Sequence, residues 1–135
     1  MPPSQRERLE VVVAWIDALR RGDLDALASL LHADVVWRGV PADAICRGRD
    51  DVLAVLRERL AEGLPDVTAI ELVAGESAVT LGVRAGDLRE VDDVPLPGQV
   101  FNVLRFQDGL IVAMEDHALR DSALAAAGAS PPEWA

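Results

Sequence analysis

The stretch WIDALRRGDLDALASLLHADVVW, from Trp15 to Trp37, carries the signals that decide how the fold begins. Apolar residues recur at helical spacing from residue 4 to residue 21, and Gly22 then ends this helix. Asp23 is a residue type that caps helix N-termini, so we expect a second helix directly after it. The apolar run 35–37 predicts a short strand. The chain therefore opens with two helices and a strand.

Further along the chain, the hydrophobic period changes from helical to alternating. Asp50 and Asp51 open a third predicted helix, which Gly63 and Pro65 end. After Pro65 the apolar residues alternate, which predicts strands over 67–73, 78–85, 99–106 and 110–118. Short turns at 75–77 and 107–109 indicate two antiparallel hairpins, whereas 87–98 is a longer acidic connection. We expect a last helical turn over 121–127 and a tail over 128–135.

This order of elements predicts an α+β fold, with three helices followed by a curled antiparallel sheet. With 135 residues the chain has the size of one domain, and its formal net charge is −10. We therefore expect a single domain over 1–135. The negative charge argues against a nucleic-acid partner, because such proteins need clustered positive charge.

The residue inventory excludes several kinds of chemistry. The chain has no Lys and no Tyr, which rules out a Schiff-base lysine, a P-loop lysine and a tyrosine acid. Two His and the single Cys46 do not suffice for a structural zinc site, and we expect no metal or organic cofactor. A lone Cys, the absence of a signal segment and the absence of a membrane-length apolar stretch favour a soluble, cytoplasmic protein.

Candidate site residues follow from the faces of the predicted strands, because a curved sheet closed by helices encloses a cavity. On the last strand Asp116 shares a face with Met114, and Asn102 lies on the same face of its own strand as Leu104. Arg84 belongs to an earlier strand. If Arg84 and Asp116 both point inward they pair; without that pairing, desolvation raises the pKa of Asp116 into the range of a general acid or base.

Trp15 and Trp37 each combine an apolar body with one N–H donor suited to a ligand oxygen. Less specific roles stay open for all of these residues. Asp116 is also compatible with a capping or ion-paired residue, Asn102 with a satisfied core amide and Trp15 with plain core. A register error of one residue would also exchange the two strand faces. The alternate face carries apolar residues suited to a dimer interface, namely Phe101, Val103 and Ala113.

Three segments resemble the NTF2-like superfamily: residues 15–37, CRGRDDV at 46–52 and FQDGLIVAMEDH at 106–117. The similarity covers about residues 8–124 and is strongest to SnoaL-like polyketide cyclases, limonene-epoxide-hydrolase-like proteins and ketosteroid isomerases. It implies a cone-shaped half-barrel of three N-terminal helices on a curved antiparallel sheet. It also implies a homodimer with an apolar pocket for a small molecule.

Compared with the ketosteroid isomerases, Trp15 stands where that family has a tyrosine donor and Gly39 where it has its aspartate base. Asn102 matches the position of a second, hydrogen-bond-donating aspartate. Compared with the limonene epoxide hydrolases, Asp116 matches an aspartate on the final strand. Gly82 and Arg84 match an arginine–aspartate pair, while Trp37 and Gly39 stand at the tyrosine and asparagine positions. The resemblance therefore keeps the fold but only part of either catalytic pattern.

Our leading hypothesis is a SnoaL-like enzyme that performs cofactor-free isomerisation, cyclisation, dehydration or hydration on an apolar, oxygen-bearing substrate. In it Asp116 moves a proton, Arg84 orients Asp116, and Trp15, Trp37 and Asn102 stabilise a developing oxyanion. Leu104 and Met114 contact the substrate. The alternative is a non-catalytic module of the same fold that binds a small molecule or assembles as a dimer. Because the chain begins at Met1, we expect a whole protein rather than part of a larger regulator.

Overall fold

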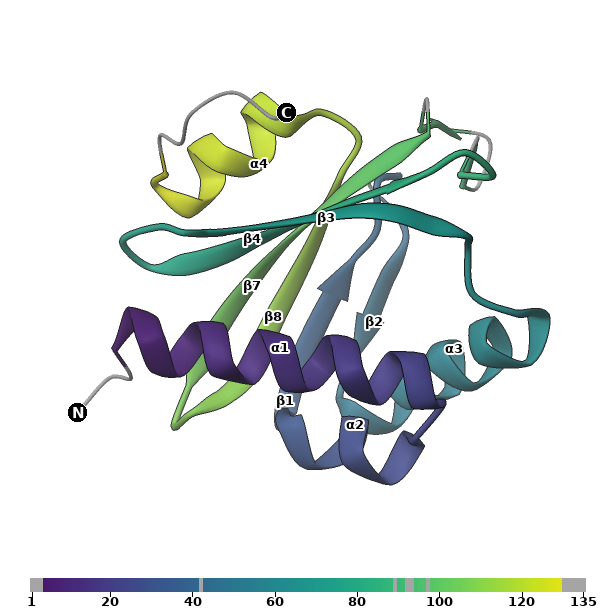
Figure 1. Cartoon of the computed structure of the whole chain (residues 1–135). Helices are drawn as coiled ribbons and strands as arrows, with labels where there is room; N and C mark the ends of the chain where they lie inside the picture. The colour runs from purple at the N-terminus through teal and green to yellow at the C-terminus, as the bar shows by residue number, and fades with distance from the viewer. Residues whose placement is uncertain (1–3, 42, 89, 92–93, 97, 130–135) are drawn as a thin grey trace.

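The computed structural model describes residues 4–41, 43–88, 90–91, 94–96 and 98–129. Figure 1 shows a twisted sheet with α1 across one face and α4 on the other. The helices are α1 (Gln5–Arg21), α2 (Leu24–Leu30), α3 (Arg49–Glu62) and α4 (Arg120–Ala127). The strands are β1 (Leu31–Arg38), β2 (Ile45–Arg47), β3 (Val67–Ala74), β4 (Ala78–Ala85), β5 (Glu90–Val91), β6 (Val94–Pro95), β7 (Gln99–Gln107) and β8 (Leu110–His117).

Helix α1 begins and ends at the residues expected from sequence, and α2 begins at its expected cap. Helix α2 ends at Leu30, however, and β1 begins at Leu31, so the first strand is longer than the expected 35–37. Ser4 accepts a hydrogen bond from the backbone N–H of Glu7 and caps α1. Gly22 adopts φ +64° at the other end, a left-handed conformation that glycine reaches without strain. Asp23 then caps α2 by accepting a bond from the backbone of Ala26 at 3.0 Å. Two adjacent capping signals therefore fix the sharp connection between α1 and α2.

The main sheet has the strand order β2-β1-β8-β7-β4-β3. The hairpins β3–β4 and β7–β8 are antiparallel, as predicted, but β1 pairs with β8 in parallel. The expected antiparallel sheet is therefore a mixed one, because the N-terminal strand inserts beside the C-terminal strand, a long-range pairing without a local signal. The irregular stretch after β1 also holds the short β2, and the last helical turn is the two-turn helix α4.

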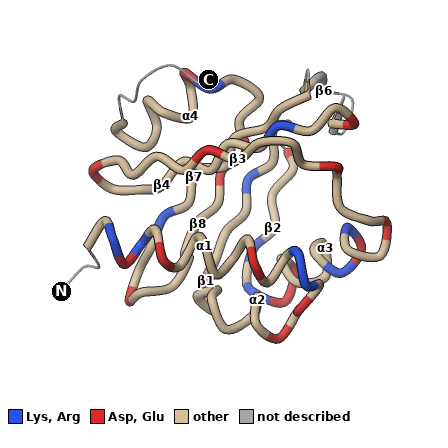
Figure 2. Tube along the Cα trace, viewed as in Figure 1, with Lys and Arg blue, Asp and Glu red and all other residues tan. Residues whose placement is uncertain are grey.

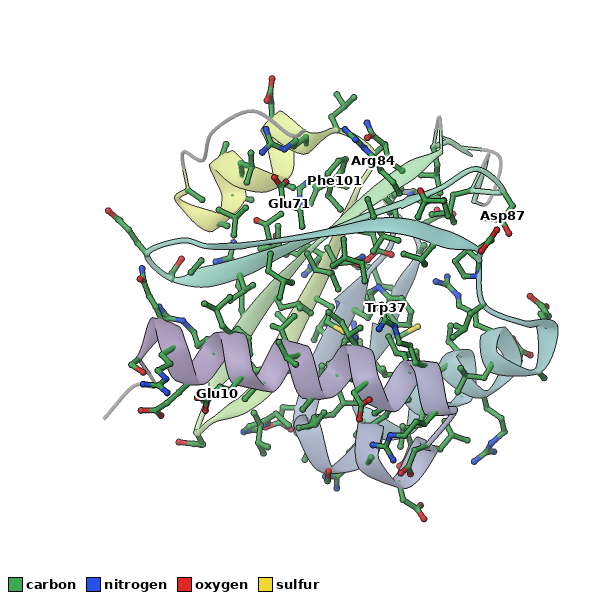
Figure 3. All side chains as sticks on the ribbon, viewed as in Figure 1. Glu10, Trp37, Glu71, Arg84, Asp87 and Phe101 are labelled. Carbon is green, nitrogen blue, oxygen red and sulfur yellow. The ribbon has the colours of Figure 1, made fainter. Side chains whose placement is uncertain are left out.

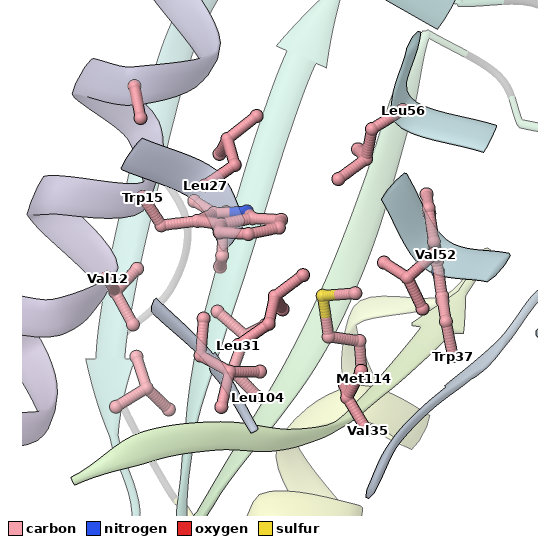
Figure 4. Packing of buried hydrophobic residues seen from close by; sticks show 14 residues of the cluster. Val12, Trp15, Leu27, Leu31, Val35, Trp37, Val52, Leu56, Leu104 and Met114 are labelled. Atoms are coloured by element: carbon pink, nitrogen blue, oxygen red, sulfur yellow. The ribbon is translucent and has the colours of Figure 1, made fainter. Parts of the chain in front are cut away.

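The two faces of the sheet carry separate hydrophobic clusters. The larger cluster joins α1, α2 and α3 to one face, which we call the cavity face (Figure 4). The smaller one joins α4 to the opposite face, which we call the outer face. The buried residues of the smaller cluster are Ala78, Phe101, Val103, Ala123 and Ala127. The α+β prediction is thus confirmed, with a fourth helix on the face that the three N-terminal helices leave open.

Irregularities in β1 and β8 modify the strict alternation that the sequence suggested. The pairing of β7 with β8 shifts between Arg105 and Phe106, as does the pairing of β1 with β8 between Leu31 and Val36. Ile111, which strict alternation would place on the face opposite to Met114, therefore joins Met114 in the core of the cavity face. Beyond the shift, alternation holds and Met114 and Asp116 share that face. None of the helices described is both long and apolar enough to cross a membrane.

Candidate functional site

A cavity of about 380 Å³ lies between the cavity face of the sheet, α1 and α3. Pockets of this size accept small organic molecules. Aliphatic side chains from all three sides form most of its wall, so a bound molecule would be largely desolvated. These aliphatic residues include Ile16, Leu56, Leu60, Ile70, Leu81, Val83, Val100, Leu104 and Met114.

Asp116 is the carboxylate set into this apolar wall. It projects from β8 beside Asn102 of β7, its direct cross-strand partner. The Trp37 indole Nε1 donates a hydrogen bond to Asp116 Oδ1 at 2.9 Å, and the Asn102 amide Nδ2 donates to the same oxygen at 2.6 Å. Among the described residues no hydrogen bond reaches Asp116 Oδ2. One oxygen thus anchors the carboxylate, and the other remains for a ligand.

The pKa of Asp116 is raised above its ordinary value of 3.8, chiefly because burial disfavours the charged carboxylate. The hydrogen bonds from Trp37 and Asn102 act in the opposite direction, as do the charges of Arg59 and His117. Desolvation wins because the two direct partners are neutral and only partly replace the lost water. Asp116 is therefore more basic than an exposed aspartate.

Arg59 is a site residue that the sequence reasoning missed. Its guanidinium carbon lies 4.8 Å from the centre of the Trp37 ring, within the range of a cation–π contact. Through this contact the positive charge lies above the indole that binds Asp116. One signal could have revealed it: Arg59 follows Leu56 by three positions, so both lie on the face of α3 that lines the cavity.

Trp15 projects from α1 toward the sheet (Figure 4) and is almost fully buried. It lines the cavity, yet its indole N–H has no hydrogen-bond partner in the part of the chain that the structure describes. In contrast, the indole N–H of Trp37 already donates a hydrogen bond to Asp116. Trp15 is therefore the indole that can donate to a ligand oxygen, and the two predicted donors have separate tasks.

The structure places six of the seven predicted site residues around the cavity, and these are Trp15, Trp37, Asn102, Leu104, Met114 and Asp116. The prediction that Arg84 faces Asp116 is wrong. Its neighbour Val83 lines the cavity, and alternation puts Arg84 on the outer face, where Figure 3 shows it above the sheet near Phe101. Strand β4 therefore carries the expected arginine, but its side chain lies on the outer face and not in the cavity.

Gly39 and Gly82, which match catalytic positions of the resembling enzymes, leave little room for a side chain. A Cβ on Gly39 would lie 2.8 Å from the Cβ of Ala44, so an aspartate base does not fit there without movement of the backbone. A Cβ on Gly82 would come within 3.0 Å of the Phe101 ring, on the outer face. Both glycines therefore accommodate close packing of their neighbours. No three His, Cys, Asp or Glu side chains of the described ranges cluster as a metal site would require.

Comparison with known proteins places this geometry in a family. Residues 12–114 match the model of the SnoaL-like domain. A relative, the ECF RNA polymerase sigma factor SigJ of Mycobacterium tuberculosis, is 32% identical over 121 residues. The match covers 83% of this chain and 38% of the sigma factor, so the chain spans well under half of that relative's length.

Solved structures agree on the architecture. An LEH-like epoxide hydrolase of M. tuberculosis superposes with a TM-score of 0.62 at 25% identity, covering 84% of each chain. An NTF2-like protein of unknown function from Burkholderia pseudomallei gives a TM-score of 0.64 at 19% identity, covering 91% of this chain and 98% of that one. The second likeness concerns the fold alone. Because the family model spans most of the chain, this protein belongs to the SnoaL-like domain family, with the NTF2-like fold.

Proposed function

We propose that this domain catalyses proton transfer on an apolar small molecule that carries a carbonyl or hydroxyl oxygen. The observation that carries the proposal is Asp116, a carboxylate with a raised pKa at the wall of an apolar cavity. A general base works best when its pKa approaches the working pH, and burial moves Asp116 in that direction. Trp37 and Asn102 hold Oδ1, so that Oδ2 is the oxygen that takes the proton.

In the proposed reaction, Asp116 Oδ2 removes a proton from a carbon next to a carbonyl group, and the electron pair of the C–H bond moves toward the carbonyl oxygen. The Trp15 N–H is the candidate donor to that developing oxyanion. Return of the proton from Asp116 to another carbon completes an isomerisation. The overall reaction is balanced without an oxidant, a reductant or a cofactor.

Deuterium exchange tests this proposal without knowledge of the natural substrate. A panel of apolar ketones is incubated with the protein in D2O, and loss of the proton next to the carbonyl is followed by NMR. We expect exchange above the buffer rate, and a fall of about 10²–10⁴-fold in Asp116→Asn, the usual contribution of a general base. The matched control is Glu115→Gln, which removes the neighbouring carboxylate on the opposite face of β8.

Two results of the exchange experiment would contradict the proposal. Wild-type protein that exchanges no ketone of the panel above the buffer rate would contradict an acid–base enzyme of this kind. Equal exchange in wild type and Asp116→Asn would remove Asp116 from the mechanism. Circular dichroism of both variants establishes that any loss of exchange occurs in folded protein.

The second candidate is a ligand-binding module without catalysis, which the similarity to sigma factor SigJ favours. A regulatory protein needs a cavity that binds a small molecule. A cavity that binds without turnover needs only a complementary shape and hydrogen-bond donors. This candidate predicts ligand-induced thermal stabilisation that persists in Asp116→Asn, with no proton exchange in either protein. The two candidates therefore give opposite results in the exchange experiment.

A further inference from the structure

The entrance of the cavity has a composition different from its interior. The lining residues that are exposed to solvent mark this entrance, which we call the mouth. They come from the end of α1, the end of α3 and the connection that leads from α3 into β3. The mouth residues are Arg20, Arg59, Glu62, Gly63, Leu64 and Val67.

The charge at the mouth is opposite in sign to that of the whole chain. Two guanidinium groups and one carboxylate belong to the mouth residues, whereas the protein as a whole carries a formal charge of −10. Figure 2 shows arginine segments where α1 ends and along α3, on the same side of the molecule. A positive mouth on an acidic protein favours an anion locally, because exposed charges act mainly within about one Debye length.

The two mouth arginines differ in their partners from Arg21 and Arg120, which form ion pairs. Arg21 forms ion pairs with Asp17 and Asp23, and Arg120 forms one with Glu71. Within the described residues, neither Arg20 nor Arg59 forms an ion pair, and the contact of Arg59 is with the ring of Trp37. Both guanidinium groups therefore keep hydrogen-bond donors for an anion.

The remaining mouth side chains suit an apolar molecule. Leu64 and Val67 are exposed to 45% and 39% of their surface, and both continue into the apolar wall of the cavity. A molecule that reaches from this entrance to Asp116 would therefore meet cationic donors and aliphatic surface as well as the carboxylate.

We infer that the ligand of the cavity is an amphipathic molecule with one anionic group, held at the mouth by Arg20 and Arg59, and an apolar body that extends inward to Asp116. The inference rests on the proposed function in one respect, since it takes this cavity as the ligand site. Both arginines lie in the last turn of their helix, where cations also stabilise the helix dipole. Arg21 shares that position on α1, so the experiment compares the two.

Two fluorescent probes with the same aromatic skeleton separate charge from shape. Anilinonaphthalene sulfonate carries one negative charge, and phenylnaphthylamine lacks it. We expect wild-type protein to bind the anionic probe more tightly, and Arg20→Gln and Arg59→Gln each to weaken that binding by about threefold to fivefold, as for other partly exposed charge pairs. Binding of the neutral probe should stay unchanged.

The controls are Arg21→Gln and Arg57→Gln, which make the same charge change on the same helices outside the cavity lining. Both should bind the two probes like wild type. Val83→Phe, which fills part of the cavity, should weaken both probes and so locate them inside it.

Several results would overturn the inference. They are equal binding of the two probes by wild type, equal losses for both probes in Arg20→Gln and Arg59→Gln, and equal losses in the control arginine variants. Anionic binding that survives Val83→Phe would overturn it as well, because the cavity would not have selected the anion. Ketone exchange without an anion preference would leave the proposed function standing and reject this inference. An anion preference without ketone exchange would reject the proposed function and support an anion-binding cavity without turnover.

Discussion

The two faces of the same sheet treat their charged residues in opposite ways. On the outer face, Arg120 binds Glu71 through two hydrogen bonds of 2.8 and 2.9 Å, and Arg105 binds Glu115 at 3.1 Å. On the cavity face, Asp116 has only the neutral donors Trp37 and Asn102. Opposite charges on the outer face therefore pair with each other and support the fold. The carboxylate on the cavity face has no ion-pair partner among the described residues, so its charge costs stability and it remains able to react with a ligand.

This contrast arises between adjacent residues of one strand. Glu115 and Asp116 follow each other along β8, but alternation sends their side chains to opposite faces. Variants on one face can therefore be compared with matched variants on the other.

The largest expected effect lies in the packing of the outer face. Phe101 is fully buried beneath α4 and lies against Gly82. Phe101→Ala should reduce the free energy of unfolding by about 3–5 kcal/mol in urea denaturation, because it leaves a large cavity. Val100→Ala, at the neighbouring cavity-lining position, should cost less because Val100 already borders open space. Equal losses would show that the outer face is not a packed core.

Removal of the outer ion pair should have the next largest effect. Arg120→Met leaves Glu71 largely buried without its cation, and we expect a loss of about 3 kcal/mol in the free energy of unfolding. Arg6→Met, which breaks an exposed pair with Glu10, should cause no measurable change. If Arg120→Met proved as mild as Arg6→Met, the outer face would not depend on charge compensation.

The ionisation of Asp116 on the cavity face should lower the stability of the folded protein as the pH rises. Below pH 3.8, Asp116 is protonated in the folded and the unfolded protein alike. Between that value and its raised folded pKa, the folded state holds a proton that the unfolded state has released, so stability falls as pH rises through this window. Asp116→Asn removes this loss and should be more stable than wild type at neutral pH.

Urea unfolding of wild type and Asp116→Asn over a series of pH values from acid to neutral measures this effect. The stability difference should grow in favour of the variant as the pH rises and then level off above the folded pKa. A difference that does not change with pH would show that Asp116 ionises as it does in the unfolded chain.

The smallest effect concerns a single hydrogen bond. Trp37→Phe removes the N–H donor to Asp116 Oδ1 while keeping an aromatic ring, so the pKa of Asp116 should rise further. Trp15→Phe removes the other cavity indole, which forms no hydrogen bond with Asp116, and should leave that titration unchanged. Carboxyl NMR titration of the three proteins decides this. The same shift in both variants would attribute the change to general packing.

Local sequence signals predicted most of the fold. Gly22 and Asp23 marked helix ends because capping and positive φ depend on the residues themselves. The hairpins followed from short turns between alternating strands. The parallel pairing of β1 with β8 had no such signal, since it joins residues 77 to 80 positions apart, such as Leu31 with Ile111, and is selected by packing.

The candidate site shows the same division. Alternation along the strands grouped Asp116 with Met114 and Asn102 with Leu104, because side-chain direction has a period of two within a strand. Which face points inward needed the tertiary structure, and Arg84 is the residue for which the inward assignment failed. Arg59 came from a helix whose orientation the sequence left open.

The sequence by itself determined the order of the main helices and long strands, the acidic charge and the set of chemistries available to a chain without Lys or Tyr. These depend on residue type and local spacing alone. Only the tertiary structure decided that Asp116 meets Trp37 and Asn102 rather than Arg84, and that Arg20 and Arg59 gather at the mouth. These relations join elements distant in sequence, and the packing of α1 and α3 over the curved sheet fixes them.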